Sequence, residues 1–280
     1  MSRWLVIGAA GQLGTDLMAV LGKDAVGIDM PQIDITDPAS VAAAVAEHQP
    51  DIVVNCAAYT AVDDAENHEE LALAVNGLGP SNIVAAAQNA RFVQVSTDYV
   101  FDGTATAPYP EDAATRPRSA YGRTKAAGET AALQHPDAFV VRTAWLYGAG
   151  GKNFVKTMLE LERTRETVSV VDDQVGQPTW SADLARQIVA LAQSDAPPGV
   201  YHGTNAGQTS WFGFTRRIFE LIGADAERVL PTTTDAFPRP APRPEYSVLG
   251  HEKWHRVGLP AMRPWDEALT EALPSIVASL

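Results

Sequence analysis

Two side chains four residues apart, Tyr121 and Lys125, can carry acid chemistry in this chain. Their segment has the spacing of a helix, so both side chains lie on one helical face. An ammonium group near a phenol favours the phenolate, lowers the pKa of the phenol and makes its proton easier to donate. Because this spacing also arises by chance on solvated helices, it predicts a site only together with other signals.

A hydroxyl group supplies the second signal. Thr97 follows the apolar residues Phe92–Val95 and so stands at the expected carboxyl end of a strand. There its hydroxyl can hydrogen-bond the oxygen of a reacting carbonyl. Thr97, Tyr121 and Lys125 together predict proton donation to the oxygen of a reacting carbonyl.

A glycine-rich loop near the start of the chain predicts where a cofactor binds. Gly8, Gly11 and Gly14 have the spacing G-x-x-G-x-x-G between a strand-like segment and a helix-like one. Glycine permits a close approach of the backbone to a pyrophosphate, and the helix N-terminus behind it faces the anion. Asp29, which ends the second strand-like segment, can accept a hydrogen bond from an adenosine ribose hydroxyl. An ordinary glycine turn is the alternative, but the flanking elements favour dinucleotide binding.

Strand-like and helix-like segments alternate through about residue 145 and must position these residues. This order predicts a parallel sheet with helices on both faces, a doubly wound α/β (Rossmann) fold. Asp37 and Pro38 form a helix start signal. The expected strands are Trp4–Ile7, Ala25–Ile28, Ile52–Asn55, Phe92–Val95 and Phe139–Val141, and the expected helices are Gln12–Leu21, Val41–His48, Leu71–Asn76 with Pro80–Asn89, and Ser119–Gln134.

Beyond about residue 150 the pattern is less regular, with proline and glycine clusters at 176–178, 196–199 and 237–244. We predict a dinucleotide-binding domain over residues 1–150, to which later segments return, and a smaller, mainly substrate-binding lobe over residues 151–280. This lobe would lie over the carboxyl edge of the sheet, where such folds bind ligands. The helices expected here are Asn153–Arg163, Ser181–Gln193, Ser210–Ile222 and Pro264–Leu280.

The overall composition narrows the class of protein. The 280 residues, 46% of them hydrophobic, can bury a core without disulfides, and Cys56 is the single cysteine. A net charge of −13 opposes binding to nucleic acid or to an anionic membrane, although a small anionic ligand stays compatible with it. No signal peptide and no long apolar stretch is evident, so we expect a cytoplasmic protein.

The order of these motifs resembles the extended short-chain dehydrogenase/reductase superfamily and, within it, the family of dTDP-4-dehydrorhamnose reductases. The matching segments run from residue 8 to residue 249, and VSTDYVFDG and DDQVGQPT are far more specific than the glycines. The other matching segments are GAAGQLG, DITDP, NCAAYTAVDDAE, YGRTKAAGE, VRTAWLYG, NFVKTM and APRPEYSVL.

The resemblance implies that Thr97, Tyr121 and Lys125 are the catalytic residues. The implied reaction reduces the C4 carbonyl of dTDP-4-dehydro-L-rhamnose to dTDP-L-rhamnose, for surface polysaccharide synthesis, with NADPH as cofactor and NADH also accepted. Asp98, Tyr99 and Trp145 would face the sugar nucleotide together with Thr97, although Trp145 could instead be a buried core aromatic. The cofactor would contact Gly8, Gly11, Gln12, Leu13, Gly14, Asp29, Asp34, Ile35, Ala57, Ala58, Tyr59, Val95, Tyr121 and Lys125.

Two metal signals lead to the prediction that no metal is bound. The segment 251–255 reads H-E-x-x-H, but glycines at 250 and 258 leave barely two helical turns, so we interpret it as a short surface helix. Some members of the resembled family bind Mg²⁺ through carboxylates at a dimer contact. Asp16 and Glu271 match two of those positions, whereas Ala182 stands at the third, which leaves a homodimer open and argues against a bridging metal.

Two other functions stay open. One is a sugar-nucleotide epimerase or dehydratase of the same fold. The other is a non-catalytic regulatory subunit resembling that of methionine adenosyltransferase, which the complete catalytic trio disfavours because binding alone does not need it. Dehydratases of this fold carry Asp–Glu after the threonine, whereas this chain has Asp98 and Tyr99, and an unperturbed phenol is a poor base at neutral pH.

Overall fold

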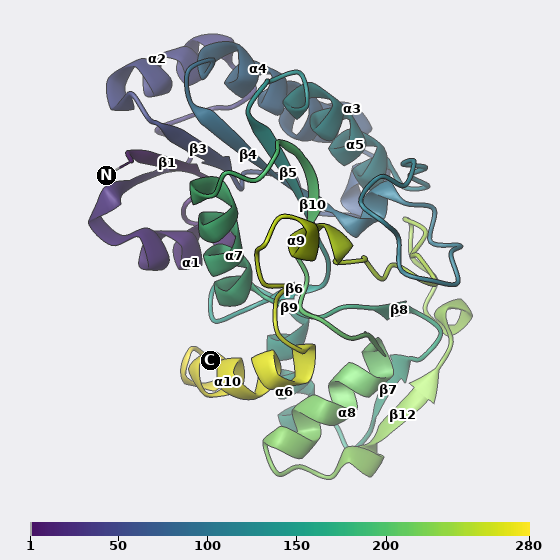
Figure 1. The fold of residues 1–280 in the computed structure, drawn as a ribbon. Coiled ribbons are helices and arrows are strands. Elements are labelled where there is room, and N and C mark those ends of the chain that lie inside the picture. The colour runs from purple at the N-terminus through teal and green to yellow at the C-terminus, as the bar shows by residue number, and fades with distance from the viewer. Residues whose placement is uncertain (1) are drawn as a thin grey trace.

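A single six-stranded sheet organises the molecule (Figure 1). In the computed structural model, which describes residues 2–280, the strand order is β10-β5-β4-β3-β1-β2 and every neighbouring pair is parallel. The predicted doubly wound α/β fold is confirmed. The strands are β1 (Trp4–Ile7), β2 (Ala25–Ile28), β3 (Ile52–Asn55), β4 (Arg91–Thr97), β5 (Ala138–Thr143) and β10 (Gly199–His202).

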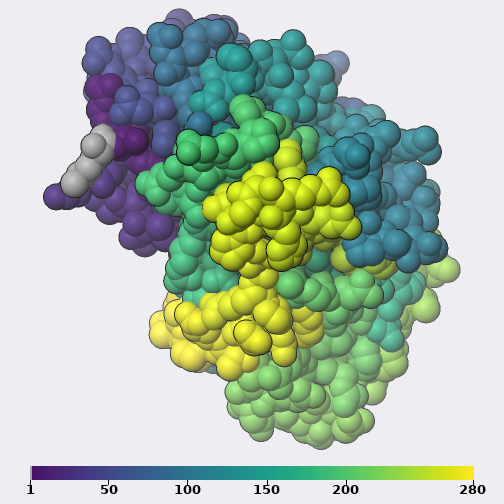
Figure 2. Space-filling view, in the orientation of Figure 1, coloured from purple at the N-terminus to yellow at the C-terminus, as the bar shows by residue number. Residues whose placement is uncertain are grey.

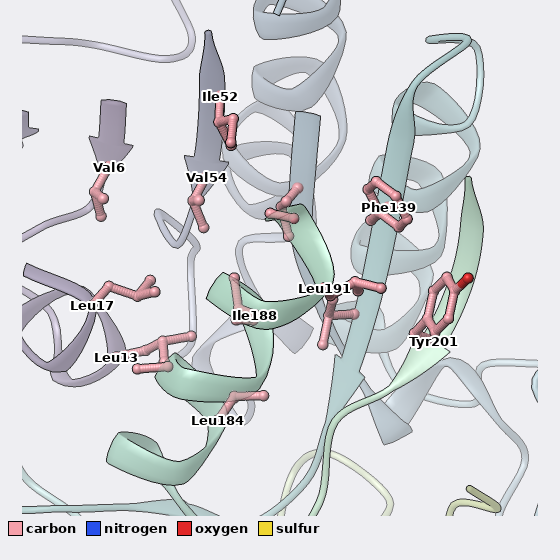
Figure 3. Packing of buried hydrophobic residues seen from close by; sticks show 14 of the residues in the cluster. Val6, Leu13, Leu17, Ile52, Val54, Phe139, Leu184, Ile188, Leu191 and Tyr201 are labelled. Atoms are coloured by element: carbon pink, nitrogen blue, oxygen red, sulfur yellow. The ribbon is translucent and has the colours of Figure 1, made fainter. Parts of the chain in front are cut away.

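Helices cover both faces of this sheet because the strands are apolar on both sides. On one face, α1 (Gln12–Leu21) and α7 (Ser181–Gln193) pack their leucines onto β1, β3 and β5, as Figure 3 shows. On the other face lie α2 (Pro38–His48), α4 (Gly79–Ala86) and α5 (Ala120–Ala132), whose apolar residues cover the alternate strand positions. Odd and even residues of each strand therefore enter two separate cores.

The helix start signals in the sequence have physical counterparts. The Asp37 carboxylate accepts a hydrogen bond of 2.9 Å from the backbone N–H of Ala39, and Pro38 is the first residue of α2. At the start of α5 the Ser119 hydroxyl accepts a hydrogen bond of 3.1 Å from the N–H of Gly122. Each cap satisfies an N–H that has no partner within its helix, so each helix begins at its cap.

A second lobe follows the fifth strand, below the sheet in Figure 1. Its apolar core is separate from both sheet cores, with Tyr147, Phe214 and Phe219 fully buried. The core is closed by α6 (Phe154–Thr164), α8 (Trp211–Leu221) and α10 (Trp265–Ala278), packed around the parallel pair β7 (Val168–Val171) and β12 (Val229–Thr232). The remaining elements are α3 (Glu69–Leu73), β6 (Leu146–Tyr147), β8 (Val175–Gly176), β9 (Thr179–Trp180), β11 (Thr209–Ser210) and α9 (Glu252–Arg256).

Two segments from beyond residue 150 lie in the sheet layer: β10 pairs with β5, and α7 packs beside α1. The strand β10 and the three short strand pairs were not among the expected elements. The last segments, yellow in Figure 2, lie across the junction between the sheet and the second lobe. The division near residue 150 stays a prediction. Over residues 2–280, no helix combines the length and apolar character needed to cross a membrane.

Candidate active site

A cleft of about 690 Å³ lies at the carboxyl ends of the parallel strands. It opens where the strand order reverses, because β2 lies on one side of β1 and β3 on the other. Every site residue expected from the sequence lines this cleft except Tyr59. The lining residues among them are Gly8, Gly11, Gln12, Leu13, Gly14, Asp29, Asp34, Ile35, Ala57, Ala58, Val95, Thr97, Asp98, Tyr99, Tyr121, Lys125 and Trp145.

The glycine loop packs closely on itself and on the loop that follows β3. Gly8 has a φ of +80°, and a Cβ there would lie 2.6 Å from the N of Ala57. A Cβ on Gly14 would lie 2.2 Å from the carbonyl oxygen of Gly8. No side chain caps the N-terminus of α1 at Gly11, and the first residues of this helix line the cleft, where their free N–H groups can bind an anion. These residues fit a dinucleotide pyrophosphate.

The adenosine end of the cleft carries two carboxylates. Asp29 accepts hydrogen bonds from the N–H of Ala10 (3.1 Å) and the N–H of Met30 (2.9 Å), which hold it at the end of β2. The side-chain and backbone hydrogen bonds from Thr36 lower the pKa of Asp34. This end is therefore negatively charged and suits a neutral ribose hydroxyl better than a phosphate.

Asn76 fixes the loop that follows β3, a residue the sequence patterns did not single out. It lies on the π-helical turn Ala74–Leu78 between α3 and α4. Its amide oxygen accepts a hydrogen bond of 2.8 Å from the N–H of Tyr59, and its amide nitrogen donates to the Tyr59 carbonyl and to Thr124 on α5. The Tyr59 hydroxyl donates instead to the carboxylate of Asp64. Asn76 therefore ties the cofactor loop to the helix that carries Tyr121.

Thr97, Tyr121 and Lys125 come together at the deep end of the cleft, each at most 9% exposed. The Thr97 hydroxyl donates to the Asp98 carboxylate (3.0 Å) and accepts from the N–H of Tyr99 (3.2 Å). The Lys125 ammonium donates to the Val95 carbonyl (2.7 Å). Thr97 stands at the end of β4 and the other two on one face of α5, as their sequence spacing predicts.

Desolvation controls the ionisation of this trio. Burial raises the pKa of the Tyr121 phenol above its ordinary value; the Thr97 hydroxyl opposes this rise and the Asp98 carboxylate adds to it. Burial also lowers the pKa of Lys125 to about 8, while Glu129 opposes the change. The net pKa of Tyr121 is therefore raised, not lowered as the spacing of Tyr121 and Lys125 predicts, because desolvation is the largest contribution. Tyr121 is held as a neutral phenol, which is the proton-donating form.

Asp98 is the buried carboxyl of the site. Burial raises its pKa to about 6, and the nearby Ser247 and Thr97 hydroxyls oppose the rise. Its second oxygen has no hydrogen-bond partner among the described residues. A polar atom left without a partner inside a site is suited to a ligand that supplies one.

A second pocket, of about 400 Å³, joins the cleft through Tyr99 and Trp145, which line both. Trp145 has a φ of 45°, a left-handed conformation rarely adopted by bulky residues, and its ring stacks on Trp211 at 3.5 Å between centroids. Arg239 and Arg243 also line this pocket, and the Arg243 guanidinium pairs with the Asp63 carboxylate at 2.8 Å. Trp211 and Arg239 were missed from the sequence, because no local motif marks them. Arg243 lies in the matching segment APRPEYSVL but was not predicted as a site residue.

The segment 251–255 serves a packing role. His251 is bonded to the Thr204 hydroxyl at 2.7 Å, and burial lowers its pKa to about 4. Trp254 is 1% exposed and its ring nitrogen donates to the His202 carbonyl, so the helix α9 is short, as expected, but anchored in the sheet core. Glu271 pairs with Arg263. Within residues 2–280, no three His, Cys, Asp or Glu side chains gather as metal ligands.

A doubly wound parallel sheet, a glycine loop and a Thr–Tyr–Lys trio at the strand ends are the features of a short-chain dehydrogenase/reductase. The model of the family described as "RmlD substrate binding domain" matches residues 2–277, and the chain belongs to that family.

Named relatives match along nearly the whole chain. A dTDP-4-dehydrorhamnose reductase of Streptomyces griseus is 52% identical over 98% of this chain and 94% of its own. A dTDP-4-keto-6-deoxy-D-glucose reductase of Streptomyces niveus is 51% identical over 99% of this chain and 98% of its own. The solved structure of a dTDP-4-dehydrorhamnose reductase from Bacillus anthracis in complex with NADP has a TM-score of 0.94 at 40% identity, covering 98% of this chain and 99% of that one.

Proposed function

We propose that this chain reduces the C4 carbonyl of dTDP-4-dehydro-L-rhamnose to dTDP-L-rhamnose with NADPH. One observation carries the proposal: Thr97 and Tyr121 line the dinucleotide cleft next to Tyr99, which also lines the second pocket, so a carbonyl bound between the pockets can reach both the proton donor and the cofactor. The names of its relatives support both the sugar nucleotide and the reaction. The product would serve the synthesis of a surface polysaccharide.

The chain's own residues would act as follows. When bound, the reduced nicotinamide supplies the hydride for C4. Tyr121, held neutral by burial, donates its proton to the oxygen as negative charge develops there. The Thr97 hydroxyl lies beside this oxygen and orients it, and Lys125 lies one helical turn from Tyr121, where its ammonium stabilises the phenolate that remains.

We assign the second pocket to the nucleotide of the substrate. The stacked Trp145 and Trp211 offer a flat apolar wall to a base, and Arg239 and Arg243 offer positive charge to a diphosphate. Asp98, through its unpartnered oxygen, and Tyr99 would contact the sugar. The cofactor is NADPH, with NADH also accepted at the carboxylate-rich adenosine end.

The direct test is turnover. Purified protein mixed with NADPH and dTDP-4-dehydrorhamnose should consume NADPH, followed by absorbance of the reduced nicotinamide, and form dTDP-rhamnose by mass spectrometry. The same assay with dTDP-4-keto-6-deoxy-D-glucose tests a second candidate substrate, which the name of the Streptomyces niveus relative favours. No NADPH consumption with either sugar nucleotide would refute the proposed reaction.

A dehydratase can be distinguished from a reductase by an assay with a different substrate. A dehydratase must remove a C5 proton and expel the C6 hydroxyl, which requires an acid and a base beside the sugar. Burial raises the pKa of Tyr99 above its ordinary value, so Tyr99 cannot act as the base at neutral pH. With dTDP-glucose and NAD⁺ we expect no 4-keto-6-deoxy product, and steady formation of that product would identify a dehydratase.

We also propose a cytoplasmic location and a homodimer. With Cys56 as its single cysteine, the chain can form no internal disulfide, which fits a reducing compartment. Leu71 and Leu78 are 54% and 56% exposed near α3 and offer apolar surface that a second copy could cover. Light scattering on the purified protein measures its mass, and a monomer at micromolar concentration would rule the dimer out.

A further inference from the structure

The cofactor cleft has a second glycine-rich segment, contributed by the chain after β6. We define the covering loop as residues 148–153, Gly-Ala-Gly-Gly-Lys-Asn. Gly151 and Lys152 of this loop line the cleft together with the glycine loop Gly8–Gly14. The cleft is therefore bounded on one side by the glycine loop and on the other by the covering loop.

The covering loop is held over Gln12, the first residue of α1. The Asn153 amide donates to the Gln12 side-chain oxygen (3.0 Å) and to the Gly148 carbonyl (2.8 Å). The Lys156 ammonium donates to the Ala149 carbonyl (2.6 Å). A Cβ on Gly150 would lie 3.5 Å from the Cα of Gln12, so the two backbones pass close together. The position of Lys152 beside the phosphate-binding end of α1 follows from these contacts.

The charges around the cleft show what Lys152 can do there. Of the described residues that line the cleft, Lys125 and Lys152 are the cations, and Asp29, Asp34 and Asp98 are the carboxylates. Lys125 is buried at the deep end and bonded to the Val95 carbonyl. Lys152 is exposed and forms no ion pair with another described residue. A dinucleotide pyrophosphate carries negative charge at the glycine loop, where the backbone supplies only partial charges.

We propose that Lys152 is a cofactor-binding residue whose ammonium neutralises the pyrophosphate of the dinucleotide from the covering loop. The inference rests on the proposed use of a nicotinamide dinucleotide. The second lobe then contributes a charge to the cofactor site, although the glycine loop belongs to the first 14 residues of the chain. The flanking glycines allow the lysine to approach the phosphates closely, and the anchored backbone limits the entropy lost when it binds.

The test is calorimetric titration of NADH, ADP and adenosine into the wild-type protein, Lys152→Ala, Lys152→Arg and Lys23→Ala. Lys23 is also an exposed lysine, and it directly precedes β2, so it lies at the amino ends of the strands, away from the cleft at their carboxyl ends. We expect Lys152→Ala to lower the affinity for NADH and for ADP by about threefold to tenfold. The affinity for adenosine should stay unchanged, because adenosine lacks the pyrophosphate. Lys152→Arg should restore the affinity, and Lys23→Ala should match the wild type.

Salt provides a second readout. Affinity of the wild type for NADH should fall more steeply with NaCl than that of Lys152→Ala, because salt screens an exposed charge pair. Equal NADH affinity in the wild type and Lys152→Ala would overturn the role of Lys152 and leave the reductase proposal standing. If Lys152→Ala lowered the affinity for adenosine as much as that for NADH, the role of Lys152 would also be overturned, because the substitution would then act by changing the conformation of the covering loop. Absence of binding of both NADH and NADPH by the wild type would refute the dinucleotide proposal itself.

Discussion

The two pockets that meet at Tyr99 and Trp145 are built in different ways. At the ends of β1 and β3 the dinucleotide cleft is lined by glycines and alanines, which leave the backbone accessible to a ligand: Gly8, Gly11, Gly14, Ala57 and Ala58. The second pocket is formed by side chains from α6, β7, α8 and the segment 237–244. A backbone-lined site depends on chain geometry and tolerates few glycine substitutions, whereas a site lined by side chains can change its ligand through single replacements. The comparison predicts that cofactor use is the more robust property of this protein and sugar choice the more adjustable one.

The largest effect should come from the proton donor at the buried end of the dinucleotide cleft. Tyr121→Phe removes the proton donor and should lower kcat by about 10²–10⁴-fold while leaving both ligands bound, because the phenyl ring keeps its packing. Steady-state kinetics with NADPH and the 4-keto sugar nucleotide measure kcat, and calorimetric titration measures the affinity for NADPH. A kcat within threefold of the wild type, roughly the scatter of such assays, would remove Tyr121 from its role.

A substitution behind the shared tryptophan should separate the pockets. A Cβ on Gly176 would lie 2.6 Å from the Trp145 ring, so Gly176→Ala must displace that ring. We expect KM for the sugar nucleotide to rise by about 10- to 100-fold, the effect of 1–3 kcal/mol of overpacking, with NADPH affinity nearly unchanged. Gly223→Ala is a control, since a Cβ there meets nothing within 4 Å, although its φ of +74° adds local strain. If Gly176→Ala weakens the binding of NADPH and of the sugar nucleotide by the same factor, the two pockets are not independent.

The pH dependence should report the buried trio. The pKa of Lys125 is lowered to about 8, so its ammonium is lost above about pH 8 and kcat/KM should fall about tenfold per pH unit there. Stability should respond in the opposite sense. Between about pH 8 and the ordinary lysine pKa near 10.4, Lys125 is protonated in more of the unfolded chains than of the folded ones. The contribution of Lys125 to the free energy of unfolding therefore rises with pH in this window.

Lys125→Met provides the control for that prediction, because methionine does not titrate. Denaturant unfolding of the wild type and the variant at pH 7.5 and pH 10 isolates the Lys125 contribution. The free energy of unfolding of Lys125→Met should exceed that of the wild type at pH 7.5, and this difference should be smaller at pH 10. A wild-type kcat/KM that stays flat to pH 10 would show that the charge of Lys125 is not required.

The smallest effect concerns cofactor preference. Asp29 lies at the adenosine end, and its carboxylate should repel a ribose phosphate, so Asp29→Ala should shift the NADPH-to-NADH ratio of kcat/KM towards NADPH by about threefold to tenfold. The accompanying loss of its hydrogen bonds to Ala10 and Met30 should weaken both cofactors alike. Asp29→Asn keeps acceptor capacity and serves as the matched variant. An unchanged ratio in both variants would show that Asp29 does not select the cofactor.

Much of the cofactor cleft could be predicted because its signals are local. The order of strands and helices specifies a parallel sheet, and parallel strands bring all their carboxyl ends to one edge. Gly8, Asp29 and Thr97, far apart in the chain, must therefore meet along that edge. Tyr121 and Lys125 share a helical face by spacing alone. These inferences need only chain direction and periodicity.

The second pocket and the ionisation of the trio were decided only by tertiary packing. Trp211 reaches Trp145, and Arg243 reaches the Asp63 carboxylate at 2.8 Å, through the way the second lobe folds onto the sheet. Nothing in the local sequence of these residues specifies such contacts. Likewise, the spacing of Tyr121 and Lys125 predicts a neighbouring charge, but the energy of that charge depends on how much water the folded chain removes. The sequence by itself therefore determined which groups meet at the sheet edge, whereas the fold as a whole determined their protonation and the shape of the pocket beside them.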